Sequence, residues 1–184
     1  MRLLPCLVLL LPSVAHAQWE SFAPRPGVEI GAEAGVGIVR SDSNPFSPGP
    51  AISVRGGYQF ANRLVPEMEL SFAYWTGSFE GISISEVAVS AMPGLRWGWV
   101  SDRIFTGVSA HVGYGYLQAS SGGQSVSDSG FALELGFDLA LQLTREITVG
   151  PHFSVEKIVV SKSGSVETGE LWFQVGLGAS FNLP

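Results

Sequence analysis

The chain has little that could build a disulfide framework, a thiol site or a basic nucleic-acid surface. Its one cysteine, Cys6, lies in an apolar stretch near the N-terminus, so the rest of the chain has no thiol chemistry. Charged residues make up 14% of the sequence, against about 25% in soluble domains, and the only lysines are Lys157 and Lys162. A formal net charge of −6 argues against nucleic acid as a partner, because phosphate binding needs basic patches.

The N-terminal segment has the features of a secretory signal peptide. Arg2 supplies the positive charge, residues 3–11 form an apolar core, and Ala15-His16-Ala17 fits a small-x-small cleavage site. We therefore predict a Sec-type signal peptide over residues 1–17, cleaved before Gln18. A periplasmic lead-in over residues 18–27 follows it.

No later apolar run is long enough for a membrane-spanning helix, so a spanning structure must be made of strands. Residues 131–143 alternate strictly: odd positions are large and apolar, and even positions are small or polar. On a strand this alternation separates an apolar face from a narrow polar face. The same pattern predicts eight strands, at about residues 28–40, 51–60, 64–75, 86–100, 104–117, 131–143, 147–159 and 171–183.

The connections between these segments alternate in length. The long ones, rich in Ser, Gly, Asp and Pro, are 41–50, 76–85, 118–129 and 160–170. The short ones are 61–63, 101–103 and 144–146. Long extracellular loops and short periplasmic turns are typical of outer-membrane barrels. The sequence predicts an all-β fold in one domain over residues 28–184: an eight-stranded antiparallel up-and-down transmembrane β-barrel. Pro93 and Pro151 lie inside strands, where we expect bulges or local pairing defects.

A soluble barrel such as a lipocalin also alternates, but with its apolar face inward. Here the polar face is rich in Gly and Ser and nearly free of Lys, which suits a tight barrel interior better than a solvated exterior. Aromatic residues of the apolar face gather near strand ends, as Trp97 and Trp99 do at a short turn and Tyr114 and Tyr116 at a long loop. Such groups are typical of membrane-interface girdles, so we predict that the apolar face contacts lipid.

The leader, the strand count, the loop alternation and the amphipathic terminal strand at 171–181 together resemble a known family. It is the family of small eight-stranded outer-membrane barrels of Gram-negative bacteria, of the OmpX and OmpA N-terminal type. The resemblance implies the bacterial outer membrane, a monomer surrounded by outer-membrane lipid and lipopolysaccharide, and recognition by the barrel assembly machinery. Asn182-Leu183-Pro184 follow Phe181, whereas family members usually end in an aromatic residue.

The polar face places a set of ionisable side chains in the lumen. They are Glu29, Glu33, Arg55, Glu67, Glu69, Glu86, Arg96, His111, Glu134, Asp138, His152 and Glu156. Hairpin arithmetic predicts four neighbouring pairs: Arg55 with Glu69, Glu67 with Arg96, Asp138 with His152, and Glu134 with Glu156. We interpret this set as an internal plug of ion pairs, because an unpaired buried charge is costly. Carboxylates outnumber arginines in this set, so we expect some of the carboxylates to have raised pKa values or to share a proton. Glu134 and Glu156 are the best candidates. A proton or cation path is the alternative.

A catalytic alternative rests on His152-Phe153-Ser154, which resembles the His-x-Ser of the lipid A 3-O-deacylase family. Asp138 could orient His152. That family's site faces lipid, however, whereas His152 and Ser154 lie on the lumen face, and Val155 replaces the Asn that commonly follows the Ser. His152, Ser154 and Asp138 are therefore weak catalytic candidates. We predict no enzyme, no metal site and no cofactor.

The predicted role is structural or interactive, through the long extracellular loops, with no ligand specified for them. An alternative is a narrow conduit for small or hydrophobic solutes, as in OmpW-like barrels. A conduit of that kind needs a lateral opening in the barrel wall. The only sign of one in the sequence is the pair of strand prolines, Pro93 and Pro151. A lipid A deacylase-like enzyme is the third alternative.

Overall fold

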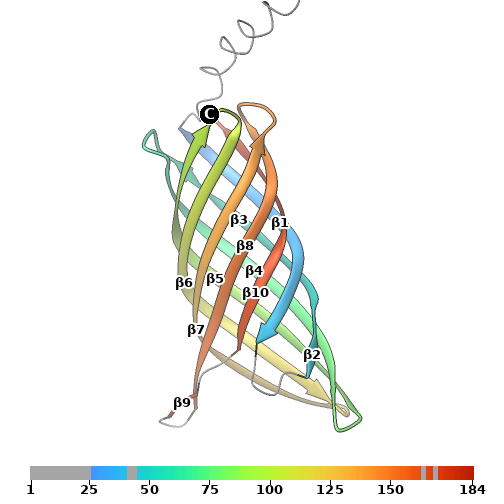
Figure 1. Cartoon of the computed structure of the whole chain (residues 1–184). Helices are drawn as coiled ribbons and strands as arrows, with labels where there is room; N and C mark the ends of the chain where they lie inside the picture. Colours follow the sequence, from blue (N-terminus) through green and yellow to red (C-terminus); the bar gives the residue numbers. More distant parts are fainter. Residues whose placement is uncertain (1–25, 41–44, 163–164, 168–169) are drawn as a thin grey trace, which may run out of the picture.

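The computed structural model describes residues 26–40, 45–162, 165–167 and 170–184 (Figure 1). The strands are β1 (Gly27–Arg40), β2 (Phe46–Ser47), β3 (Gly49–Gln59), β4 (Leu64–Phe79), β5 (Ile82–Ser101), β6 (Ile104–Ser121), β7 (Gln124–Gln142), β8 (Ile147–Lys162), β9 (Ser165–Glu167) and β10 (Leu171–Leu183). The predicted signal peptide and most of the lead-in lie outside the described residues. No helix among the described residues has the length and apolar character needed to cross a membrane.

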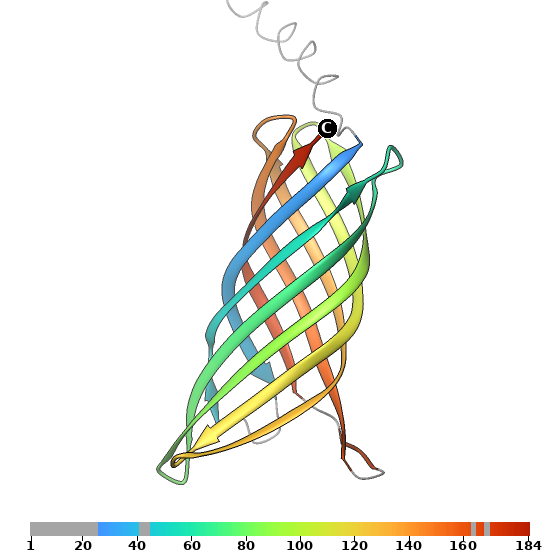
Figure 2. The same cartoon turned by 180° about the vertical axis from the view of Figure 1, so that it is seen from behind.

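The long strands form one closed sheet. Each of them pairs antiparallel with its neighbour in the order β10-β1-β3-β4-β5-β6-β7-β8, and β10 also pairs with β8. The views from opposite sides show strongly tilted strands around the whole wall, with the C-terminus at the same end as the short turns (Figures 1 and 2). This confirms the predicted eight-stranded antiparallel barrel, to which β2 and β9 add short ribbons at the opposite end.

The two faces of the wall differ as the alternation predicts. Leu135 and Leu177 are each 67% exposed on the outer face, whereas Ala132, Glu134 and Asp138 are buried inside. The outer face is apolar along every long strand, and the polar face is turned inward. The soluble-barrel alternative, with its apolar residues inside, is therefore wrong.

Two connections expected to be long loops are strand instead. Residues 76–85 form the ends of β4 and β5 around the turn Glu80-Gly81, and residues 118–129 form the ends of β6 and β7 around Gly122-Gly123. All four turn residues have positive φ, between 51° and 84°, as a type I′ hairpin turn requires. These segments are rich in serine and glycine, which are typical of loops, but the backbone ladder continues through them.

Neither strand proline produces a bulge. The pairs on either side of Pro93, at Ala91 and Gly94, follow one register between β5 and β6. Pro151 likewise interrupts the β7–β8 pairing without shifting its register. The strands stay close at the first gap, because a Cβ added to Gly113 would lie 2.1 Å from the carbonyl oxygen of Ala91. The expected local pairing defects are present, but these gaps do not open the wall.

Candidate functional site

The lumen is filled by the side chains that the polar face supplies. All twelve predicted lumen residues are buried, and none is more than 7% exposed. They come from every long strand except β10, which adds the buried amides Gln174 and Asn182. Serines from β3, β4, β5, β6 and β8 fill the spaces between the charged groups.

The register matches the hairpin arithmetic at three of the four expected pairs. The cross-strand partners are Arg55 with Glu69, Asp138 with His152, and Glu134 with Glu156. Glu67 lies opposite Gly94 instead, but Arg96 reaches it with Nε 3.1 Å from Glu67 Oε2. Cross-strand partners do not always form an ion pair, however. The Arg55 guanidinium forms its ion pairs with residues other than its partner Glu69.

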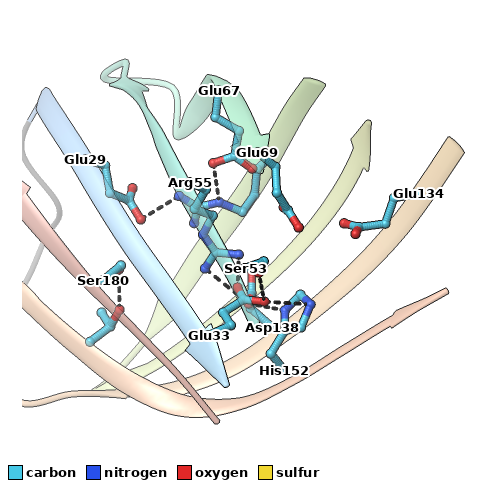
Figure 3. A network of polar contacts seen from close by, with 12 residues as sticks. Glu29, Glu33, Ser53, Arg55, Glu67, Glu69, Glu134, Asp138, His152 and Ser180 are labelled. Carbon is cyan, nitrogen blue, oxygen red and sulfur yellow. Dashed lines mark hydrogen bonds and ion pairs between the residues drawn. The ribbon is translucent and has the colours of Figure 1, made fainter. Parts of the chain in front are cut away.

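One ion-pair group, which we call the Arg55 cluster, contains Glu33, Ser53, Arg55, Asp138 and His152 (Figure 3). The guanidinium forms ion pairs with Glu33 and with Asp138, the latter at 3.3 Å. His152 bridges the same two carboxylates, with Nδ1 2.9 Å from Asp138 and Nε2 2.9 Å from Glu33. Ser53 donates a hydrogen bond to Glu33. The guanidinium and the imidazole therefore face the same two carboxylates, and β1, β3, β7 and β8 are joined across the lumen.

A second group, the Arg96 cluster, contains Glu29, Glu67, Arg96 and His111. Arg96 forms ion pairs with Glu29 and Glu67, and the ring of Phe105 lies 5.5 Å from its guanidinium carbon. His111 Nε2 is 3.1 Å from Glu67 Oε1. The arginine and the imidazole thus hold Glu67 through its two different oxygens.

Three further carboxylates, Glu69, Glu134 and Glu156, lie beside His111. His111 Nδ1 is 3.1 Å from Glu134 Oε1 and 3.7 Å from Glu69 Oε2. Ser71 donates a hydrogen bond of 2.9 Å to Glu156. No arginine or lysine of the described residues forms an ion pair with any of these three carboxylates, in contrast to the Arg55 cluster.

The suggested catalytic set does not assemble. Both ring nitrogens of His152 face carboxylates, Nδ1 facing Asp138 and Nε2 facing Glu33. Ser154 is buried in the lumen beside this network, 5% exposed, and not on the lipid face. His152 therefore serves the ion-pair cluster, and the geometry offers Ser154 no free base.

Sequence reasoning missed an apolar layer at the extracellular end of the lumen. Trp75 and Trp172 pack there with ring centroids 5.4 Å apart and an interplanar angle of 62°. Both are buried, and Met92 and Ile158 are buried in the same cluster. The signal was available, because Trp75 shares its strand face with Glu67 and Glu69 and Trp172 shares its face with Gln174.

Little space remains between these layers. Two lumen cavities towards the periplasmic end have volumes of about 20 and 10 Å³, each enough for about one water molecule. The first lies beside Glu29 and Asn182 and the second beside Arg55 and Asp138. The lumen is therefore packed with a polar layer below an apolar one.

A hollow lies at the β4–β5 and β6–β7 hairpins, near the extracellular end of the barrel. It has a volume of about 700 Å³, and we call it the serine pocket. Its hydroxyl-bearing lining residues are Ser47, Tyr74, Thr76, Ser78, Ser83, Ser85, Ser120 and Ser121. Glycines and Pro45 complete most of the lining, and none of the described lining residues is charged.

Comparison with known proteins identifies the barrel. Residues 4–181 match the family described as outer membrane protein beta-barrel domain. The chain belongs to this family. Membership places it in the bacterial outer membrane and agrees with the resemblance seen in the sequence. No curated protein sequence matches the chain at a significant level.

Several solved outer-membrane barrels share the fold. Neisserial surface protein A is 12% identical, with 85% of this chain and 97% of that chain covered and a TM-score of 0.64. Ail of Yersinia pestis, in complex with the heparin analogue sucrose octasulfate, is 17% identical, with 85% and 99% covered and a TM-score of 0.57. OprG of Pseudomonas aeruginosa is 11% identical, with 88% and 100% covered and a TM-score of 0.50. At these identities the likeness shows the fold alone.

Proposed function

We propose that this protein is a closed outer-membrane barrel that binds an extracellular ligand at its β4–β5 and β6–β7 hairpins. The serine pocket carries the proposal, because it is a large hollow near the water-exposed end, while the lumen below it is packed. Pockets of several hundred Å³ are typical of small-molecule and saccharide-sized ligands.

The chemistry of the pocket favours a neutral, hydroxyl-rich ligand such as a polysaccharide. Serine and threonine hydroxyls both donate and accept hydrogen bonds, and Tyr74 adds an aromatic surface against which a sugar ring can pack. A sulfated glycan such as the heparin analogue in the Ail complex would need arginine or lysine. Neither residue type occurs in the part of the lining that the structure describes.

A conduit has less support. Trp75 and Trp172 are 0% and 1% exposed and lie across the extracellular half of the lumen, and the Arg96 and Arg55 clusters fill the part below. Neither proline gap opens the wall. We therefore expect no conductance steps from the protein in planar bilayers; regular steps would favour transport over surface binding.

Binding can be tested with the protein in nanodiscs, using neutral dextran and heparin as probes. Ser120→Val removes one pocket hydroxyl, and Ser125→Val is the matched control, because Ser125 is the cross-strand partner of Ser120 and lies outside the pocket. Valine suits a strand. Loss of one or two hydrogen bonds predicts a roughly tenfold weaker binding of dextran for Ser120→Val alone. Binding of heparin but not dextran would contradict the proposed ligand class. Binding of neither would leave the hairpins as a surface for a protein.

A further inference from the structure

The lumen carries a concentration of negative charge that its own cations do not neutralise. Glu33 and Asp138 face Arg55 and His152, and Glu29 and Glu67 face Arg96. Among the described residues, Glu69 and Glu134 form ion pairs with His111 alone and Glu156 forms none, and each of the three is at most 3% exposed. Uncompensated charges at such depth are strongly disfavoured. The site therefore needs either protons or a cation from outside the chain.

We infer that Glu69, His111 and Glu134 form a binding site for a divalent transition-metal ion of the zinc type. These residues come from β4, β6 and β7: His111 and Glu134 are cross-strand partners in the β6–β7 hairpin, and Glu69 reaches them past the intervening strand β5. Each offers one ligand atom, and the three atoms lie within 4.8 Å of one another. Ligands bonded at about 2.1 Å around a tetrahedral zinc lie about 3.4 Å apart. The distances of 3.1 and 3.7 Å from His111 Nδ1 to Glu134 and Glu69 are close to that value.

Glu69 supplies an independent sign that a ligand belongs here. Its side chain is 1% exposed, and its Oε2 atom accepts no hydrogen bond. In the close-up view the carboxylates of Glu69 and Glu134 point into the same space (Figure 3). A buried carboxylate oxygen without a donor is costly, and a metal ion between these groups would satisfy it.

The surroundings of His111 also fit a metal ligand. Its Nε2 atom faces Glu67 at 3.1 Å, which leaves Nδ1 directed at Glu69 and Glu134. Metal-bound histidines almost always donate their second ring N–H to a carboxylate or carbonyl, which fixes the tautomer and the ring orientation. Arg96 in turn holds Glu67, with Nε 3.1 Å from Oε2.

The Arg55 cluster contains a similar group of ligand atoms but differs from the proposed site by its arginine. Glu33, Asp138 and His152 also bring three ligand atoms within 4.8 Å. There, as at His111, both imidazole nitrogens face carboxylates, but Arg55 also forms ion pairs with the same two acids. An arginine of the chain therefore compensates carboxylate charge in that cluster, which no arginine does by an ion pair at Glu69 and Glu134 among the described residues. Imidazole with carboxylates suits zinc better than calcium or magnesium, which prefer oxygen ligands alone.

Because the lumen is packed, the ion would enter as the barrel closes, and the test uses refolding. The full chain is refolded from urea into detergent with Zn²⁺, with Ca²⁺, or with a chelator. Each sample is then washed with chelator, and its metal content is measured by mass spectrometry. We expect about one zinc per folded chain, a higher urea midpoint with zinc than with chelator, and no retained calcium.

Variants locate the site. Glu69→Gln should lower zinc retention at least tenfold, and Glu67→Gln, which acts through His111, should weaken zinc binding about 10- to 100-fold. Glu86→Gln is the matched control, because Glu86 is another buried carboxylate that belongs to neither ligand group, and it should retain zinc as the parent does. If Glu69→Gln does not fold, as judged by heat-modifiable gel mobility, Glu134→Gln takes its place. If the parent retains no zinc and its urea midpoint is the same with zinc and with chelator, the inference is wrong, and protons compensate the buried carboxylates instead. Retention of calcium in place of zinc, or unchanged retention in both ligand variants, would also overturn it.

Discussion

The indole Nε1 of Trp75 donates a hydrogen bond of 2.9 Å to the carbonyl oxygen of Gly37, inside the lumen and across from β4 to β1. Gly37 leaves room for the ring, since a Cβ at this position would lie 3.1 Å from it. The contact ties two strands that do not pair with each other. It also fixes the apolar layer at the extracellular end.

Trp75→Ala should therefore destabilise the barrel strongly. Removal of a buried tryptophan costs about 3–5 kcal/mol, and equilibrium unfolding in urea with lipid vesicles would measure the loss. Trp97→Ala is the matched control, because Trp97 is 51% exposed on the outer face. It should cost clearly less. A similar loss for both variants would show that the inner tryptophan layer does not stabilise the barrel.

The Arg55 cluster predicts a non-additive response. Arg55→Met leaves Glu33 and Asp138 buried without their main cation, which should cost about 3–5 kcal/mol of the free energy of unfolding. Adding Glu33→Gln and Asp138→Asn removes the unpaired charges and should restore most of that loss. Arg145→Met, at an exposed turn, should stay within about 0.5 kcal/mol of the parent. If the losses of unfolding free energy from the three substitutions simply add up in the triple variant, Arg55 is not energetically coupled to Glu33 and Asp138.

The turn between β6 and β7 predicts a purely conformational effect. Gly122 has φ 56°, and a Cβ added there would meet nothing within 4 Å. Gly122→Val should cost about 1–2 kcal/mol, because a β-branched residue is strained at positive φ. Gly122→Asn should cost much less, since asparagine tolerates this region. Urea unfolding and limited proteolysis of the hairpin would measure both variants, and equal losses would show that volume, not φ, limits this position.

A pH effect is expected from Glu170, which lies in the connection before β10. Burial raises the pKa of its carboxyl group above the usual range. The folded state therefore disfavours the charged form, and stability should fall as pH rises from the ordinary carboxyl range through the raised pKa. Glu170→Gln should remove this decline, so its urea midpoint should exceed that of the parent at pH 8 but not at pH 4. Glu80→Gln, at an exposed hairpin tip, serves as the control. An equal shift at both pH values would exclude ionisation as the cause.

Much of the wall could be predicted from the sequence. The alternation in residues 131–143 identified which side chains face lipid, because side chains on a strand alternate between the two faces. Tight turns then set the register, so Arg55 opposite Glu69 and Asp138 opposite His152 followed from counting. The hairpins at 76–85 and 118–129 were wrongly expected to be loops, because their serine- and glycine-rich composition is typical of loops. The two-residue turns with glycine were the missed signal.

The chemistry inside the barrel needed the tertiary structure. The sequence by itself determined which residues enter the lumen and which residues lie opposite them on neighbouring strands. Only the tertiary structure decided that Arg55 contacts Glu33 and Asp138, and that Glu69 meets His111 and Glu134. The reason is geometric. In an eight-stranded barrel the lumen is barely wider than its side chains, so a long side chain can reach strands far away in the chain, and strand pairing alone does not specify which one.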